Sequence, residues 1–215
     1  VHEDNFTYLE RHDGTMVMDE FGTETACRIA HPSRSIDDIS GCEIVLLCTQ
    51  TEYHKEVLRR VVPLLVPGQI LLIVPGYLST ASVLGLDPAQ GVIIVEGESN
   101  FIDGRISEPG RFKVGFRNVR NPLGIYPAAS AAEAEKKLDM LGTPFFYLKS
   151  VVEAALHNPN MIVHTVGAVM SIPRIEATGG DYCMYHEVFT PSVWRVLEAL
   201  DGEKMQVLEK LGCEP

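Results

Sequence analysis

Two runs of consecutive branched apolar residues, joined by an amphipathic helix, constrain the fold of this chain more than any other feature. The first run covers residues 43–49 (EIVLLCT) and the second covers residues 69–74 (QILLIV). Between them, apolar residues recur at helical spacing over 51–66 and stop at Pro67-Gly68. Strands that are apolar on both faces are typical of parallel sheets covered by helices, so we expect a parallel strand–helix–strand unit.

The same alternation of strands and helices continues downstream. The expected elements are helices over 77–85 and 128–141 and strands over 92–95, 112–116, 124–126 and 144–148. Ser130 and Glu133 lie at the spacing of a capping box, which predicts a helix start there. This order of elements predicts an α/β fold with a doubly wound parallel sheet of the Rossmann type.

The pattern changes near residue 150. Residues 151–170 form one long apolar stretch interrupted by Pro159, and residues 191–211 form a second helical region. No convincing strand pattern follows in this part of the sequence. We therefore expect a Rossmann-like nucleotide-binding domain over residues 1–150 and the start of an all-helical second domain over residues 151–215.

The expected sheet is incomplete at its N-terminus. Residues 1–10 are interpreted as the end of a strand that runs into a helix, and the pattern Gly-x-Gly occurs nowhere in the chain. Dinucleotide-binding α/β domains carry a glycine-rich loop after their first strand, where it approaches the pyrophosphate. Either this sheet does not bind a dinucleotide, or its first strand–loop–helix unit precedes Val1.

The composition argues against several classes of function. The formal net charge of -11 disfavours binding to nucleic acid or to an anionic membrane surface, because like charges repel. No stretch approaches the roughly 20 apolar residues of a membrane span, and the first residues show no signal-peptide pattern. The cysteines are scattered and form no Cys-x-x-Cys pair, which predicts reduced thiols in a cytoplasmic protein.

The densest group of polar residues lies in an apolar helical stretch, at residues 157–165 (HNPNMIVHT). Asn160 and His164 are four residues apart and share a helix face, where the imidazole could act as an acid or base beside the amide. The alternative is a core histidine, with an asparagine that bonds the backbone freed by Pro159. His157 and His164 could share a metal ion, but no carboxylate lies between them, so no metal site is predicted.

Polar residues also follow the first buried strand. Thr49, Gln50 and His54 come directly after it, at the carboxyl edge where open α/β sheets bind ligands. His54 could equally be an exposed cap of the helix that begins there. The pair Gly179-Gly180 is interpreted as a turn, and no Gly-x-Ser-x-Gly pattern supports a serine hydrolase.

These residues resemble the opine dehydrogenase family. Residues 157–167 are similar to the family's Asn-x-Asn-x-x-x-His segment, and the following stretches are similar to the helical domain of octopine/nopaline dehydrogenases. Those stretches are residues 174–176 (RIE), 180–182 (GDY), 190–193 (TPSV) and 197–204 (LEALDGEK). Upstream, Thr49-Gln50 and Pro75-Gly76 are similar to the family's nucleotide-binding half, which is shared with ketopantoate-type reductases.

The resemblance implies an NAD- or NADP-dependent enzyme that reductively couples an amino acid to a 2-oxo acid. His164 matches the catalytic histidine of the family, and Asn160 matches the asparagine that accompanies it. The residues that would lie along the cofactor are Thr49, Gln50, His54, Pro75, Gly76, Glu98 and Ser99, the last two on the nicotinamide side. The amino acid and the 2-oxo acid are the expected partners, and a homodimer is left open.

Two features of the family are expected outside residues 1–215. Its glycine-rich loop should precede Val1, and its catalytic aspartate, which would hold the histidine, should follow Pro215. By itself the chain is therefore expected not to be a competent enzyme. Three hypotheses follow: part of a full-length opine dehydrogenase, a non-catalytic remnant that binds another chain, or a ketopantoate-reductase-like enzyme that reduces a 2-oxo acid without an amine.

Overall fold

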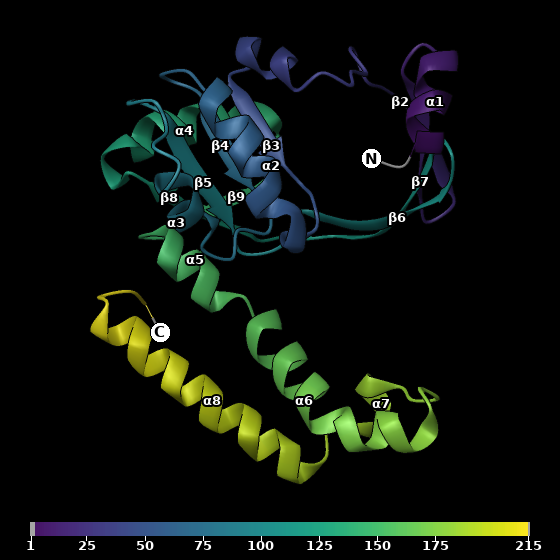
Figure 1. The fold of residues 1–215 in the computed structure, drawn as a ribbon, viewed down its shortest axis with the longest axis vertical. Coiled ribbons are helices and arrows are strands. Elements are labelled where there is room, and N and C mark those ends of the chain that lie inside the picture. Colours follow the sequence, from purple (N-terminus) through teal and green to yellow (C-terminus); the bar gives the residue numbers. More distant parts are fainter. Residues whose placement is uncertain (1–2, 215) are drawn as a thin grey trace.

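The two apolar runs form the centre of a five-stranded sheet in the computed structural model, which describes residues 3–214 (Figure 1). The strand order is β3-β4-β5-β8-β9. These strands are β3 (Ile44–Leu47), β4 (Ile70–Ile73), β5 (Ile93–Gly97), β8 (Asn121–Tyr126) and β9 (Phe145–Tyr147). The first three strands run parallel, β8 runs antiparallel to β5, and β9 runs parallel to β8. The predicted α/β sheet is confirmed, with one antiparallel pairing that the sequence did not predict.

Helices cover both faces of this sheet. One face carries η1 (Ile36–Gly41), η2 (Thr51–Tyr53), α2 (His54–Val61), η3 (Val62–Leu64) and α3 (Ser79–Leu84), and the other carries η4 (Ala128–Ser130), α4 (Ala131–Leu138) and η5 (Asp139–Leu141). Strand β4 shows why two layers form. Leu71 and Ile73 pack with Leu58 of α2, whereas Ile70 and Leu72 pack with Leu138 of α4. Alternate side chains of one strand thus supply two apolar cores.

Two local expectations were wrong. Strand β3 was expected to be buried on both faces, but it is the edge of the five-stranded sheet and the side chain of Leu46 is 49% exposed. The capping box at residue 130 does not form, because the Ser130 side chain accepts no hydrogen bond from the helix. Glu133 instead forms an ion pair with Lys137, one helical turn further on, at 2.7 Å.

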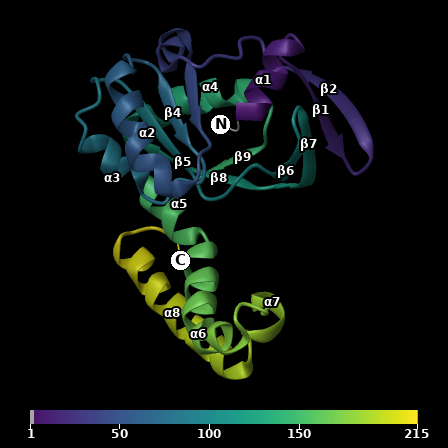
Figure 2. The ribbon, with the colours of Figure 1, turned by 45° about the vertical axis from the view of Figure 1, so that its right-hand side comes forward.

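A second, four-stranded sheet lies beside the first and has the order β2-β1-β7-β6 (Figure 2). It contains β1 (Thr15–Glu20), β2 (Thr23–Arg28), β6 (Ile102–Glu108) and β7 (Arg111–Arg117), and α1 (Glu3–Arg11) precedes it. Of these strands, the sequence predicted only β7. The predicted end of a strand at Val1-His2 lies outside the described residues. Both ribbon views show the hairpin of β6 and β7 reaching from the central sheet to the β1–β2 hairpin.

Four helices follow the sheets and form an arm, which we call the helical arm. They are α5 (Val151–His157), α6 (Asn160–Thr178), α7 (Met184–Glu187) and α8 (Pro191–Lys210). Pro159 separates α5 from α6, as the sequence predicted, and Gly179 and Gly180 end α6 with positive φ angles of 62° and 93°. Helices α6 and α8 pack through Ile162, Val166, Val193 and Leu197. The predicted boundary between domains near residue 150 stays a prediction.

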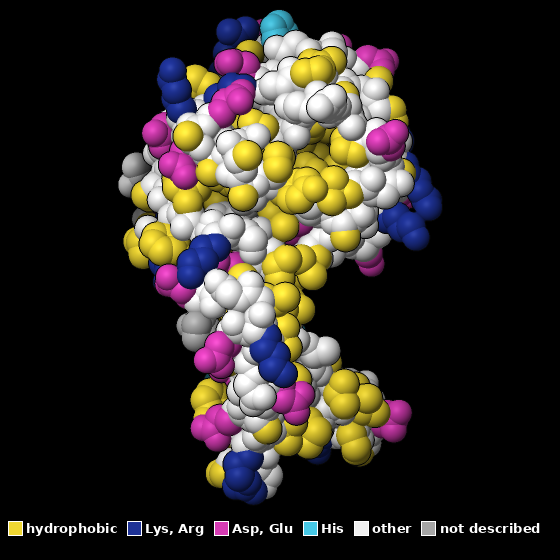
Figure 3. Space-filling model, turned by 90° about the vertical axis from the view of Figure 1, so that its left-hand side faces the viewer, with side chains coloured by type: hydrophobic (Ala, Val, Ile, Leu, Met, Phe, Trp, Pro, Cys, Tyr) yellow, Lys and Arg dark blue, Asp and Glu magenta, His cyan; other side chains and the backbone are white. Residues whose placement is uncertain are grey.

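Apolar side chains remain on the surface of the helical arm and at its junction with the sheets (Figure 3). Val169, Trp194 and Val207 are exposed examples from α6 and α8. Within residues 3–214, none of the helices combines the length and apolar character needed to cross a membrane.

Candidate functional site

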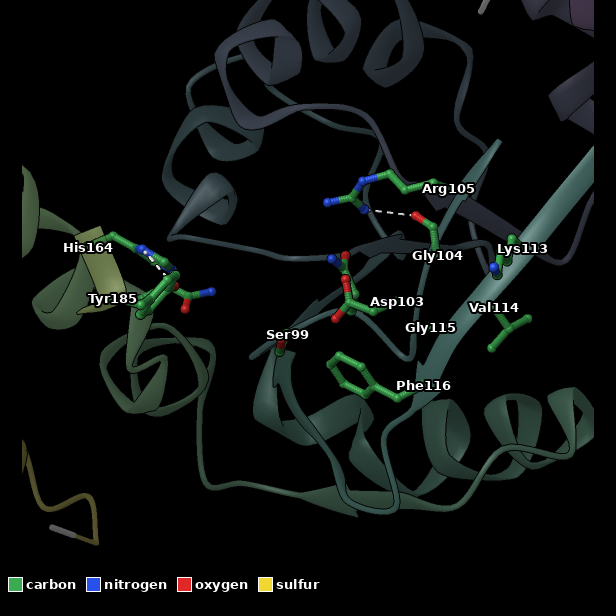
Figure 4. A pocket seen from close by; sticks show the side chains of 12 residues that line it. Ser99, Asp103, Gly104, Arg105, Lys113, Val114, Gly115, Phe116, His164 and Tyr185 are labelled. Carbon is green, nitrogen blue, oxygen red and sulfur yellow. Dashed lines mark hydrogen bonds between the residues drawn. The ribbon is translucent and has the colours of Figure 1, made fainter. Parts of the chain in front are cut away.

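A cavity of about 630 Å³ lies between the β6–β7 hairpin and the helical arm (Figure 4). Its lining comes from the segment after β5, from both hairpin strands and from α6 and α7. The lining residues are Ser99, Asn100, Asp103, Gly104, Arg105, Lys113, Val114, Gly115, Phe116, Asn160, His164 and Tyr185. A polar cavity of this volume is large enough for small-molecule ligands. Three of the residues singled out from the sequence, Ser99, Asn160 and His164, meet there.

Asn160 and His164 present one face of α6 to this cavity. Both are exposed, and their four-residue spacing places them one turn apart, as predicted. The Tyr185 hydroxyl lies 3.3 Å from the His164 ring nitrogens, and the two rings meet edge to face with centroids 5.9 Å apart. The alternative of a core histidine is therefore wrong. Tyr185 orients an exposed imidazole, and no pattern in the sequence indicated this partner.

Asn158 holds the start of α6 against the end of β5. Its side chain is only 1% exposed; its Nδ2 donates to the Glu98 carbonyl at 2.5 Å, and its Oδ1 accepts from the Asn160 amide at 2.9 Å. This arrangement brings Ser99 and Asn160 to one cavity. Sequence reasoning missed this positioning role, although the first asparagine of the Asn-x-Asn-x-x-x-His segment could have indicated it.

We expect Asn158→Ala to lower the free energy of unfolding by about 1–3 kcal/mol, because two backbone groups lose their buried partner. Asn160→Ala is the matched control, since this exposed side chain should change stability by roughly 0.5 kcal/mol or less. Urea unfolding of both variants measures the difference. Equal effects of the two substitutions would show that Asn158 does not hold the junction.

The carboxyl ends of the three parallel strands meet at one edge of the sheet, where the sequence placed the cofactor. Thr49 and Gln50 follow β3 and are exposed. The Gly76 amide donates to the Gly97 carbonyl at 2.9 Å, which joins the ends of β4 and β5. Neither Thr49 nor Gln50 lines the cavity described above. Their exposed polar groups are available to a ligand that crosses this edge.

His54 is buried within the protein and is not an exposed cap. Its Nδ1 lies 3.0 Å from the Ser79 hydroxyl, and its Nε2 lies 3.1 Å from the Thr49 carbonyl. The ring therefore ties the loop after β3 to α3. A cofactor contact at His54, as predicted, would have to break one of these two bonds.

Pro75 and Gly76 lead from β4 into a turn that is shaped by Glu96. This carboxylate is fully buried and accepts hydrogen bonds from the Leu78 amide at 2.8 Å and from the Thr80 amide and hydroxyl, each at 2.6 Å. A Cβ at Gly76 would collide with the Glu96 side chain. The internal carboxylate thus requires glycine at this position, whether or not a cofactor lies beside it. In the sequence, the sign of this structural role of Glu96 is that it is a lone glutamate at the end of an apolar strand.

Burial raises the pKa of Glu96, and the donors from Thr80 and Leu78 offset only part of that effect. In the interval between the unfolded and the higher folded pKa, the native state binds more protons than the unfolded state. Stability from this group is therefore fully present below the unfolded pKa and is lost as pH rises through the folded pKa. The free energy of unfolding of the wild type minus that of Glu96→Gln should fall across this interval in urea titrations. A difference that stays flat or rises contradicts the assignment.

Glu98 lies at the junction with the helical arm and is half-buried, but it does not line the cavity. Burial raises the pKa of its carboxyl, and the positive charges of Arg120, Lys204 and a protonated His157 act in the opposite direction. The predicted cofactor role of Glu98 stays a prediction.

The residues described do not gather into a metal site. Within residues 3–214, no group of three or more histidine, cysteine or carboxylate side chains is close enough to hold an ion. His157 does not line the cavity with His164, and its Nε2 lies 2.9 Å from the Glu214 carbonyl.

The fold is shared with a class of dehydrogenases and reductases. The chain is similar to octopine dehydrogenase solved with NADH and L-arginine, at 17% identity and a TM-score of 0.61, over 85% of this chain and 48% of that one. It is similar to apo yersinopine dehydrogenase at 16% identity and a TM-score of 0.67, over 97% of this chain and 55% of that one. It is also similar to a PanE/ApbA family ketopantoate reductase from Ralstonia eutropha JMP134, at 13% identity and a TM-score of 0.65. This comparison covers 98% of this chain and 65% of the reductase.

A family match is more specific for the helical part. Residues 147–215 match the family described as NAD/NADP octopine/nopaline dehydrogenase, alpha-helical domain. The predicted resemblance to opine dehydrogenases is confirmed for this part, and the predicted Rossmann-like fold with a following helical part is confirmed by the similar structures. A search of curated protein sequences finds no match. The chain spans about half the length of the octopine dehydrogenase that it matches.

Proposed function

We propose that this protein is an opine-type dehydrogenase, which uses NADH or NADPH to couple an amino acid reductively to a 2-oxo acid. One observation carries the proposal. His164 and Asn160 lie in the segment that matches the octopine/nopaline dehydrogenase helical domain, and both face a cavity that begins at the end of β5. The octopine dehydrogenases of similar fold were solved with NADH together with L-arginine, agmatine or pyruvate.

The residues at the sheet edge fit a dinucleotide in part. Thr49 and Gln50 offer exposed polar groups after β3, and Ser99 lines the cavity after β5. The side chains of His54 and Glu96 bond within the protein. Thr49, Gln50 and Ser99 are therefore the residues that would hold the cofactor, which supplies the hydride when bound.

The helical arm supplies the proton chemistry. When an amine condenses with a 2-oxo acid, the carbonyl oxygen leaves as water and must be protonated. The exposed imidazole of His164 can donate that proton into the cavity, and Tyr185 limits the orientation of its ring. The Asn160 amide, one helical turn away, can donate a hydrogen bond to the same oxygen.

The alternative is direct reduction of a 2-oxo acid, as in a ketopantoate-type reductase. The observation that favours it is the fold, because the ketopantoate reductase comparison covers 98% of this chain. In that reaction His164 would protonate the carbonyl oxygen and no amine would be needed. The match of residues 147–215 to octopine/nopaline dehydrogenases favours the opine reaction over this alternative.

The two reactions differ in their requirement for an amine. We expect the purified full-length protein to oxidise NADH or NADPH with pyruvate only when an amino acid is present. Rates should be compared across a panel of amino acids and 2-oxo acids, each also supplied alone. Oxidation with a 2-oxo acid alone would support the reductase alternative, and no oxidation with any pair would support a non-catalytic protein.

A further inference from the structure

Two cations are paired in the register of the β6–β7 hairpin at the edge of the cavity. Arg105 and Lys113 are directly paired in the antiparallel register, and both line the cavity. Side chains of directly paired residues project from the same face of a sheet, where like charges repel each other and destabilise the pairing. An arrangement of this kind is stabilised when an anion lies between the two charges.

The neighbouring cations of the same sheet are neutralised, whereas these two are not. Arg28 pairs with Asp13 at 2.9 Å, and Arg117 pairs with Glu20 at 2.6 Å. Among residues 3–214, neither Arg105 nor Lys113 forms an ion pair, although the net charge of the chain is -11. The Arg105 guanidinium donates only to the adjacent Gly104 carbonyl, at 2.8 Å. Among the cations that this sheet contains in the described part of the chain, Arg105 and Lys113 are therefore the two that lack a carboxylate partner.

The local backbone also sets these residues apart from the rest of the hairpin. A register shift between Asp103 and Gly104 leaves Gly115 as an extra residue in β7, next to the paired cations. Bulges of this type redirect side chains and are common beside binding sites. Asp103 lines the cavity as well but forms no ion pair with Arg105 or Lys113. Figure 4 shows Arg105 and Lys113 across the cavity from His164 and Tyr185.

We propose that Arg105 and Lys113 form an oxyanion subsite, which holds the carboxylate of a small-acid substrate while its other end faces His164 and Asn160. This inference rests on the proposed function for the choice of a carboxylate. A dinucleotide phosphate has the same oxyanion chemistry, and its binding can be tested separately. Arg105 offers a planar fork of donors and Lys113 a point charge, so the two together suit an oxyanion that is approached from two sides.

Binding titrations test the subsite without requiring turnover. Pyruvate and NADPH are each titrated into the wild type, R105Q/K113Q, Arg105→Lys and the control Lys136→Gln, which removes an exposed cation from α4. We expect R105Q/K113Q to bind pyruvate roughly ten- to a hundredfold more weakly, because charge-assisted bonds are lost. Lys136→Gln should bind like the wild type, whereas Arg105→Lys should bind with intermediate affinity, because it keeps the charge but loses the planar fork of donors. The unliganded double variant should melt at a slightly higher temperature, because the cross-strand repulsion is gone.

Each outcome bears on the proposal. If only NADPH binding weakens, the oxyanion is a phosphate of the cofactor, and the subsite stands with that ligand. If R105Q/K113Q binds both probes like the wild type, or if the wild type binds neither, the subsite is refuted. Weakened pyruvate binding without any NAD(P)H oxidation would support the subsite and refute the proposed dehydrogenase. Normal amine-dependent turnover with an unchanged pyruvate KM in the double variant would refute only the subsite.

Discussion

Replacing His164 by glutamine is expected to lower kcat for amine-dependent NAD(P)H oxidation roughly a hundred- to ten-thousandfold, the usual contribution of a general acid. Glutamine keeps a polar side chain in the cavity but cannot release a proton. His164 is exposed, and among residues 3–214 its ring bonds with Tyr185 alone, so the free energy of unfolding should stay within roughly 0.5 kcal/mol of the wild type. Steady-state kinetics together with urea unfolding separate the two effects.

His157→Gln is the matched control for this substitution. His157 lies seven residues earlier, outside the cavity, and its ring bonds with the Glu214 carbonyl at 2.9 Å. Its replacement should leave kcat close to the wild-type value. If His164→Gln keeps the wild-type kcat, or if both variants lose activity equally, His164 is not the acid of the reaction.

Of the substitutions proposed for this protein, Gly124→Ala is expected to lower the free energy of unfolding most, by on the order of 3 kcal/mol or more, because a buried position becomes overpacked. The start of α5 packs directly on β8 at this point. A Cβ at residue 124 would lie 2.5 Å from the Cα of Val151 and would also collide with the Ser150 carbonyl. Both contacts are with backbone, so relief requires that α5 moves away from the sheet. Urea unfolding measures the loss.

Gly202→Ala is the control, and it is expected to raise the free energy of unfolding rather than lower it. Gly202 lies inside α8, and a Cβ there would meet no atom within 4 Å. Alanine should therefore stabilise the helix by about 0.5–1 kcal/mol. If Gly124→Ala is as well tolerated as Gly202→Ala, the helical arm does not dock on β8 in the way described. Because Asn158 follows α5 directly, movement of this helix should also weaken pyruvate binding in the cavity.

The central sheet could be predicted because its signals are local. Residues 70–73 are branched, apolar and completely buried, so a short window of sequence is sufficient. The helix breaks at Pro159 and at Gly179-Gly180 were predictable for the same reason. The burial of β3 was not, because whether a strand is an edge depends on which strands pair with it.

The second sheet could not be predicted because its pairing is distant in sequence and its strands are mostly exposed. Strand β1 pairs with β7, with Val17 opposite Arg111. Strand β6 exposes both Ile102 and Ile106, so it shows no alternation of buried and exposed residues. Tertiary pairing rather than local propensity therefore determines this region.

In the candidate site, too, the residues that local spacing determines could be predicted, and those that depend on tertiary contacts could not. The pair of Asn160 and His164 follows from helical spacing alone, and the sequence therefore identified it. The role of Asn158 depends on its contact with Glu98, and its place in the Asn-x-Asn-x-x-x-His segment was the one local sign of that role. The role of Tyr185 depends on its contact with His164, and no local pattern encodes it. The register that places Arg105 opposite Lys113 could likewise not be predicted from the sequence, because β6 was not expected to be a strand.

The product formed from a nitrogen-labelled amino acid and pyruvate tests the central claim most directly. The proposed reaction joins the amino nitrogen to the carbonyl carbon of the oxo acid. Mass spectrometry after incubation with NADH and NADPH should therefore find a secondary amine that carries the label and both carbon skeletons. A labelled amino acid that remains unchanged beside a 2-hydroxy acid, or with no product at all, would contradict the account.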